Sequence, residues 1–132
     1  MSVELLWLAL TVVMTGLIWI PYILDRIAVR GLTATLASPS PLDKPQSPWA
    51  QRMMAAHANA VENLVIFAPL VLIAQALSIS SPTTIFACAL YFWSRAAHLA
   101  VYTLGIPVLR TLAFTGGFIA QAILALALFD LL

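Results

Sequence analysis

The sequence predicts an all-α fold: an integral membrane protein whose single domain is a bundle of four transmembrane helices. Of its 132 residues, 63% are hydrophobic and only 8% are charged, whereas soluble domains carry about 25% charged residues. A chain with so few charges cannot cover itself with a surface that water solvates. Four apolar segments follow one another along the chain, each long enough to supply the ~20 residues that a transmembrane helix needs. This length accommodates one domain.

The apolar segments and their connectors define the expected helices. We place the four segments at about residues 4–24, 49–77, 83–104 and 108–132. The connector at about residues 25–48 is long and rich in proline, which argues against a continuous helix there. The other two connectors are tight turns, so the helices they join should be antiparallel neighbours. Pro21 and Pro69 lie inside apolar segments, where we expect a kink or an interrupted run of helical hydrogen bonds.

The basic residues predict the orientation of the chain. Most of them surround the first connector and one follows the third: Arg26, Arg30, Lys44, Arg52 and Arg110. The second connector carries no charge, and the two chain ends carry only Glu4 and Asp130. By the positive-inside rule, the first and third connectors should face the cytoplasm and both termini the opposite side.

Composition argues against nucleic-acid binding and against disulfide bonding. The formal net charge is +1, and nucleic-acid binding needs a clustered basic face. Cys88 is the only cysteine and lies in an apolar run, where a thiol usually packs as a small hydrophobic residue. No metal ligands are assigned.

Two polar stripes are predicted, one on the second helix and one on the third. At 3.6 residues per turn, one side of the second helix carries Arg52, Asn59, Glu62 and Asn63. The third helix has a stripe at spacing i, i+4, i+7, i+11: Tyr91, Arg95, His98 and Tyr102. An ionisable residue within a membrane span is costly unless it faces a partner or a wet cavity. We therefore expect the two stripes to face each other or a shared cavity.

The tight turn between these helices predicts which residues share a depth in the membrane. Glu62 lies 16 residues before Ser78, while Arg95 and His98 lie 13 and 16 residues after Pro82. At about 1.5 Å per residue, Glu62 should lie level with Arg95 and His98. Two interpretations are open: an ion pair that clamps the helices, or a wet cytoplasmic pocket for an anionic polar ligand. His57 is one position off the stripe, which favours a structural role.

Two motifs and the turn that follows them carry a resemblance to a known family. The second helix contains Asn-x-x-Glu at residues 59–62, leading into an apolar run, and the third contains Arg-x-x-His-x-x-x-Tyr at residues 95–102. Gly105 in the next turn and Arg110 at the start of the fourth helix continue the pattern. Over essentially the whole chain the sequence resembles the MAPEG family, the membrane-associated proteins in eicosanoid and glutathione metabolism. Similarity to its prokaryotic-type members implies the inner (plasma) membrane of a bacterium.

The resemblance implies a homotrimer of four-helix protomers that binds glutathione between neighbouring subunits near the cytoplasmic side. Arg110 is then expected to be the catalytic residue that stabilises the glutathione thiolate, and Arg95 to pair with Glu62. The residues expected to bind glutathione are Arg26, Arg52, Asn59, Glu62, Arg95, His98 and Tyr102. The implied activity is that of a membrane transferase or peroxidase, which conjugates or reduces lipophilic electrophiles that arrive through the membrane lipid.

Two positions depart from the pattern of the family's glutathione enzymes. Those enzymes carry an arginine four residues before the motif asparagine, where this chain has Ala55 and the nearest arginine is Arg52, one turn further back. Phe114 stands where a tyrosine is found. These differences favour an alternative function, a non-catalytic membrane protein of the same fold that binds lipid or a protein partner. A proton-coupled transporter ranks last, because the first span has no acidic residue between Glu4 and Asp25.

Overall fold

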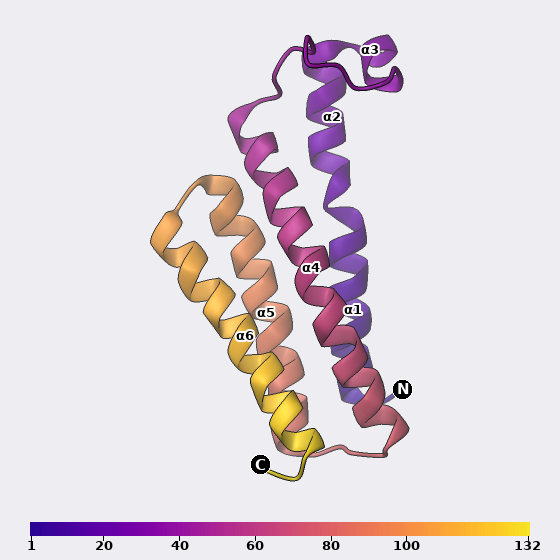
Figure 1. Cartoon of the computed structure of the whole chain (residues 1–132), viewed down its shortest axis with the longest axis vertical. Helices are drawn as coiled ribbons and strands as arrows, with labels where there is room; N and C mark the ends of the chain where they lie inside the picture. The colour runs from indigo at the N-terminus through magenta and orange to yellow at the C-terminus, as the bar shows by residue number, and fades with distance from the viewer.

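The computed structural model describes all 132 residues and contains helices and no strands (Figure 1). The helices are α1 (Val3–Leu17), α2 (Trp19–Arg30), α3 (Leu32–Leu36), α4 (Pro48–Ala76), α5 (Pro82–Leu104) and α6 (Pro107–Leu128). α1 and α2 form one continuous rod, and this rod, α4, α5 and α6 are each long and apolar enough to cross a membrane. The predicted fold, an all-α membrane protein with four spanning helices, is therefore confirmed.

The first rod is interrupted near its middle and extends further than expected. Helical hydrogen bonding breaks at Ile18, because Pro21 has no N–H group to donate to the carbonyl four residues earlier. Ile18 keeps right-handed helical backbone angles, so the rod continues to Arg30, six residues beyond the expected end at residue 24. Gly31, with φ of +81°, ends it, since a positive φ is readily adopted only by glycine.

The remaining boundaries differ from expectation by a few residues. Pro69 lies inside α4, which nevertheless runs unbroken for 29 residues. The short helix α3 within the first connector was not predicted. The last helix ends at Leu128, four residues before the expected end at residue 132, and Phe129 closes its final turn with a bond from its N–H to the carbonyl of Leu126.

The end of the first connector is anchored to α2 by a buried polar cluster. Asp25 is 9% exposed and Gln46 is 6% exposed. The Asp25 carboxylate accepts hydrogen bonds from the backbone N–H and the hydroxyl of Ser47 and from the Gln46 amide. The same amide also donates to the carbonyl of Tyr22 over 2.7 Å. These bonds fix the position from which α4 starts.

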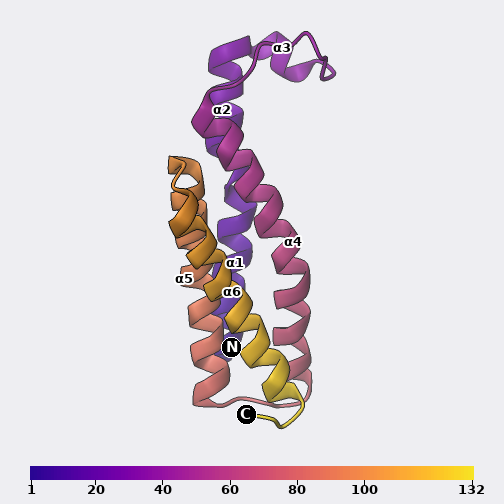
Figure 2. The same cartoon turned by 60° about the vertical axis from the view of Figure 1, so that its left-hand side comes forward.

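The two termini lie at the opposite end of the bundle from the first and third connectors (Figures 1 and 2). Both termini and the turn between α4 and α5 lie at one end of the bundle, while α3, the first connector and the turn between α5 and α6 lie at the other. The rod of α1 and α2 and the helix α4 extend beyond the α5–α6 turn. α5 packs against α1, α4 and α6, so it is the central helix of the bundle.

The apolar core lies in the half of the bundle nearer the termini. Its buried members come from all four rods: Leu8, Phe67, Val71, Ala87, Cys88, Tyr91, Ala120 and Leu124. The rings of Phe67 and Tyr91 stack with centroids 3.7 Å apart. Tyr91 belongs to the predicted polar stripe of α5, yet its ring is fully buried and packs as part of the core. Cys88 is fully buried, in keeping with its expected packing role.

Glu4 forms a second buried polar cluster at the terminal end of the bundle. It is 4% exposed, and its Oε1 atom accepts hydrogen bonds from the hydroxyls of Ser80 (2.8 Å) and Thr84 (2.7 Å). Thr84 also forms the capping box of α5 with Ser81. Glu4 lies in the first turn of α1, so the positive ends of two helices meet at its carboxylate.

Candidate functional site

A small polar cavity lies between α4, α5 and α6 at the connector end of the bundle. Its volume is about 220 Å³, and its walls are Asn59, His98, Tyr102, Arg110, Thr111 and Phe114. Four of these residues, one from α4, two from α5 and one from α6, were predicted site residues. The structure therefore brings together one residue of the predicted α4 stripe, the second half of the predicted α5 stripe and the arginine in the first turn of α6.

Arg95 lies behind the polar cavity, where it contacts two of the residues that line it, Asn59 and His98. It is 3% exposed, and its Nη2 atom donates a hydrogen bond to Oδ1 of Asn59 over 2.6 Å. The same Nη2 atom lies 3.4 Å from Nδ1 of His98. The Nε and Nη1 atoms are buried and have no hydrogen-bond partner in the chain. A buried guanidinium is normally paired and fully hydrogen-bonded, so Arg95 retains unused capacity to bind an anion.

The predicted pair between Arg95 and Glu62 does not form. The chain's one ion pair joins Arg30 and Asp43 over 3.6 Å, and Glu62 is exposed on the surface of the bundle. Counting residues from a turn predicts how deep a residue lies in the membrane, but not the direction in which its side chain leaves the helix. Three residues along a helix correspond to about 300° of rotation, so Glu62 leaves α4 about 60° away from Asn59. Asn59 therefore faces Arg95, and Glu62 faces outward.

Arg110 is held over an aromatic wall of the polar cavity. Its guanidinium carbon lies 4.7 Å from the centre of the Tyr102 ring, which is a cation–π contact. The Tyr102 ring in turn meets His98 edge-on with centroids 5.4 Å apart, and Phe114 lies 6.3 Å from His98 on the other side. Arg110 is in the first turn of α6, where unpaired backbone N–H groups add positive potential.

The other two predicted arginines lie outside this cavity. Arg26 donates through Nε to Oε1 of Gln46 over 2.9 Å, which ties it to the first connector. Arg52 donates through Nε to the carbonyl of Thr103 over 2.8 Å, at the C-terminal end of α5. His57, expected to be structural, shares a 2.8 Å hydrogen bond with the Tyr22 hydroxyl and joins α4 to α2.

A stripe on α6 was missed by the sequence analysis. Arg110, Phe114, Gly117 and Gln121 follow the same i, i+4, i+7, i+11 spacing as the stripe on α5. Gln121 is 6% exposed and donates to the backbone carbonyl of Asn63 over 3.1 Å. Gln121, a glutamine in the largely apolar last span, could have revealed this stripe, because polar groups inside a membrane generally face the bundle interior.

A larger apolar cavity adjoins the polar one. Its volume is about 500 Å³, and six of its eight lining residues are hydrophobic. It lies between α4 and α6, and Phe114 lines both cavities. Asn63 and Gln121 supply its polar lining. A charged cavity and an apolar one therefore share a wall, an arrangement suited to one polar and one lipophilic ligand.

Comparison with known proteins supports the resemblance seen in the motifs. The family model that matches the chain is that of the MAPEG family, over residues 4–129. No curated protein and no solved structure gives a significant match. Because the matched range includes every residue of the polar cavity and nearly the full length of the four spanning helices, the chain belongs to the MAPEG family.

Proposed function

We propose that the protein is a glutathione-dependent transferase or peroxidase that acts on lipophilic electrophiles. The MAPEG family, to which the chain belongs, includes such enzymes and also non-catalytic members. The observation that carries the proposal is the uncompensated charge of the polar cavity. Arg110 lines this cavity and Arg95 lies behind it, bonded to the lining residue Asn59, and neither arginine forms an ion pair with a carboxylate of the chain. Glutathione, with two carboxylates and a thiol that reacts as its anion, has the complementary charge.

The proposed roles follow from the position of each side chain. Arg110 faces the cavity from the first turn of α6, where its guanidinium would favour the thiolate over the thiol. Arg95 and Asn59 lie deeper and would bind a carboxylate. In conjugation, the thiolate sulfur attacks an electrophilic carbon, a C–S bond forms, and the leaving group departs with the bonding electrons.

The size of the polar cavity argues for a contribution from a second copy of the chain. Ligand pockets usually measure about 300–1,000 Å³, and this cavity measures about 220 Å³. Glu62 is exposed on a spanning helix and has no partner within the chain, although a charge that faces lipid is costly. Both observations are accounted for if neighbouring protomers of a homotrimer cover the face that carries Glu62. In this proposal, the role of Arg26 and Arg52 is limited to the hydrogen bonds that hold the connector end of the bundle in place.

The adjoining apolar cavity is the proposed site of the lipophilic substrate. Its volume of about 500 Å³ is within the usual range for a ligand pocket. Since Phe114 lines both cavities, a substrate bound there would present its reactive carbon near Arg110. We propose that the first and third connectors, near which the basic residues lie, face the cytoplasm. Glutathione would then enter from the water and the electrophile from the bilayer.

The test is a measurement of bound thiolate on the detergent-solubilised full chain. With glutathione added, the ultraviolet thiolate absorbance should appear in the wild type and be lost in Arg110→Ala, because the guanidinium favours the anion. Arg30→Ala is the matched control, since Arg30 pairs with Asp43 outside the polar cavity. Glu62→Gln should weaken glutathione binding if a neighbouring protomer completes the site. Absence of both a thiolate signal and turnover of a generic aryl halide by the wild type would exclude this function.

One structural observation favours the non-catalytic alternative. Ala55 occupies the position where the family's glutathione enzymes carry an arginine, and the nearest arginine, Arg52, is bonded to the carbonyl of Thr103 instead. Loss of one charge-assisted hydrogen bond to a carboxylate costs about 1.5–3 kcal/mol. A protein that retains lipid through purification and shows no thermal shift with glutathione would belong to this alternative class.

A further inference from the structure

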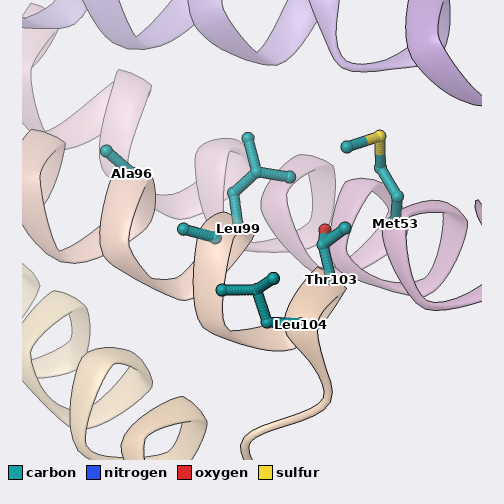
Figure 3. Close-up of a pocket in the computed structure, with 6 residues that line it drawn as sticks. Met53, Ala96, Leu99, Thr103 and Leu104 are labelled. Atoms are coloured by element: carbon teal, nitrogen blue, oxygen red, sulfur yellow. The ribbon is translucent and has the colours of Figure 1, made fainter. Parts of the chain in front are cut away.

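A third cavity is a groove on the outer surface of the bundle, at the same end as the polar cavity. Its volume is about 370 Å³, within the usual range for a ligand pocket. Met53 of α4 lines it together with Ala96, Leu99, Ala100, Thr103 and Leu104 of α5. In Figure 3 the side chains of Leu99 and Thr103 point toward the space beside Met53. The groove arises where the small Ala96 and Ala100 leave room among larger neighbours.

This groove is separate from the proposed glutathione site. α5 turns by about 100° per residue, so the centre of the groove residues on this helix is about 130° from the centre of the set Arg95, His98 and Tyr102. The polar cavity and the groove share no lining residue. An occupant of the groove would therefore not compete directly with an anion bound at Arg95.

The lining of the groove fits an extended apolar ligand. Five of its six residues are hydrophobic, and both helices that form it are long and apolar enough to span a membrane. From Ala96 to Leu104 the groove follows α5 for eight residues, or about 12 Å. In a bilayer, a hollow of this shape that opens on the protein surface is in contact with lipid acyl chains.

An arginine, Arg52, lies beside the connector end of the groove and is bonded to one of its lining residues, Thr103. Arg52 donates through Nε to the carbonyl of Thr103, and its two Nη groups have no bonding partner in the chain. Its side chain lies against Gly105, where an added Cβ would be 3.3 Å from Nε. The hydroxyl of Thr103, which lines the groove, is buried and has no hydrogen-bond partner. The guanidinium of Arg52 therefore lies next to the point where the apolar surface ends, while the hydroxyl of Thr103 is enclosed beneath it.

The depth of this positive end matches that of lipid headgroups. Trp49 precedes Met53 by four residues, so both lie on the same side of α4. Trp49 is 38% exposed near the start of α4, and tryptophan is enriched at the membrane–water interface. Arg52 lies within one turn of Trp49 along α4, so it should lie near the same interface.

We infer that this groove binds an anionic phospholipid, with one acyl chain along α5 between Ala96 and Leu104 and the phosphate at Arg52. The inference is independent of the proposed glutathione chemistry. Apolar burial supplies affinity for any phospholipid, while the guanidinium, unpaired with any carboxylate of the chain, supplies the preference for a negatively charged headgroup.

The experiment offers the detergent-solubilised full chain equal amounts of phosphatidylglycerol and phosphatidylcholine with identical acyl chains, and counts retained lipids by native mass spectrometry. The wild type should retain one phosphatidylglycerol per protomer with about fivefold preference: both phosphates can accept a hydrogen bond from Arg52, but choline cancels the net negative charge, whose attraction to an arginine is worth about 1 kcal/mol. Arg52→Gln should bind both lipids about equally. Arg52→Lys keeps the charge and should keep most of the preference.

Filling the groove tests its apolar part. Ala100→Phe places a ring in the groove and should reduce retention of both lipids, whereas Ala97→Phe is the matched control, because Ala97 is exposed on α5 but does not line the groove. Ala96→Leu fills the deeper end and replaces Ala100→Phe if that variant does not fold. Equal retention of the two lipids by the wild type would overturn the inference. So would a preference that survives in Arg52→Gln or is lost in Arg30→Gln.

Discussion

The Nη2 atom of Arg95 lies 2.6 Å from Oδ1 of Asn59, and this bond joins α5 to α4 beside the polar cavity that Asn59 lines. Asn59 is a neutral partner, so the bond orients the guanidinium without cancelling its charge. A carboxylate in the same place would neutralise the cavity. Because residue 59 is an amide and not an acid, the positive charge of Arg95 remains available to attract an anionic ligand.

The first prediction is that Asn59→Asp separates stability from binding. The new carboxylate would pair with Arg95, so the melting temperature should not fall, whereas glutathione affinity should drop by at least about tenfold because the cavity's charge is compensated. Thermal unfolding and a glutathione titration of the solubilised protein provide the two readouts. Asn63→Asp is the control, since it adds the same charge one turn away without contacting Arg95. Undiminished glutathione affinity in Asn59→Asp would show that Arg95 does not bind the ligand.

The second prediction concerns the ring beneath Arg110. Tyr102→Leu removes the cation–π contact of 4.7 Å, a contact of about 0.5–2 kcal/mol, and should weaken the thiolate absorbance with glutathione. Tyr102→Phe keeps the ring and should retain the position of Arg110. If the phenylalanine variant loses the signal as fully as the leucine variant, the hydroxyl of Tyr102 and not its ring acts on the thiol.

The helices could be predicted from the sequence because a membrane leaves the backbone few alternatives. Every backbone N–H and C=O group inside a bilayer must be satisfied within the protein, so apolar segments of sufficient length must be helical. The break near Pro21 follows from the same rule. The extension of the first rod to Arg30 could not be predicted, because it depends on the bonds that Asp25 makes with a connector residue 22 positions away.

The site could be predicted only in part, for a geometric reason. The spacing of Arg95, His98 and Tyr102 placed these residues on one face of α5, as the structure shows. Spacing does not determine how one helix is rotated against another, and the pairing of Arg95 with Glu62 was wrong for that reason. The position of Arg52 was equally undetermined, because a long side chain reaches several partners and only the packed structure selects the carbonyl of Thr103.

The third prediction is that the cluster at Glu4 stabilises the fold without affecting ligand binding. Thr84→Val removes one of the two hydroxyls that donate to the Glu4 carboxylate and, with it, the acceptor of the Ser81 N–H in the capping box of α5. Loss of a hydrogen bond to a charged group should lower the free energy of unfolding by about 1.5–3 kcal/mol. Glutathione affinity should be unchanged below the unfolding transition, since this cluster lies at the terminal end of the bundle, away from the polar cavity. Thr83→Val is the control, because Thr83 is exposed. Equal stability of the two variants would show that Glu4 needs only one donor.

The fourth prediction tests the close approach of α6 to α5. A Cβ atom added at Gly116 would lie 2.5 Å from Oγ of Ser94 and 3.4 Å from its Cβ, so only the hydroxyl stands in the way of a methyl group. Gly116→Ala should therefore destabilise the protein by about 1–3 kcal/mol, the usual cost of overpacking. Ser94→Ala should relieve most of that cost in the double variant, because the remaining 3.4 Å contact needs only a slight shift. A double-mutant cycle of unfolding free energies measures this coupling. Additive effects would mean that Ser94 turns its hydroxyl away freely and that the two helices are not held at this distance.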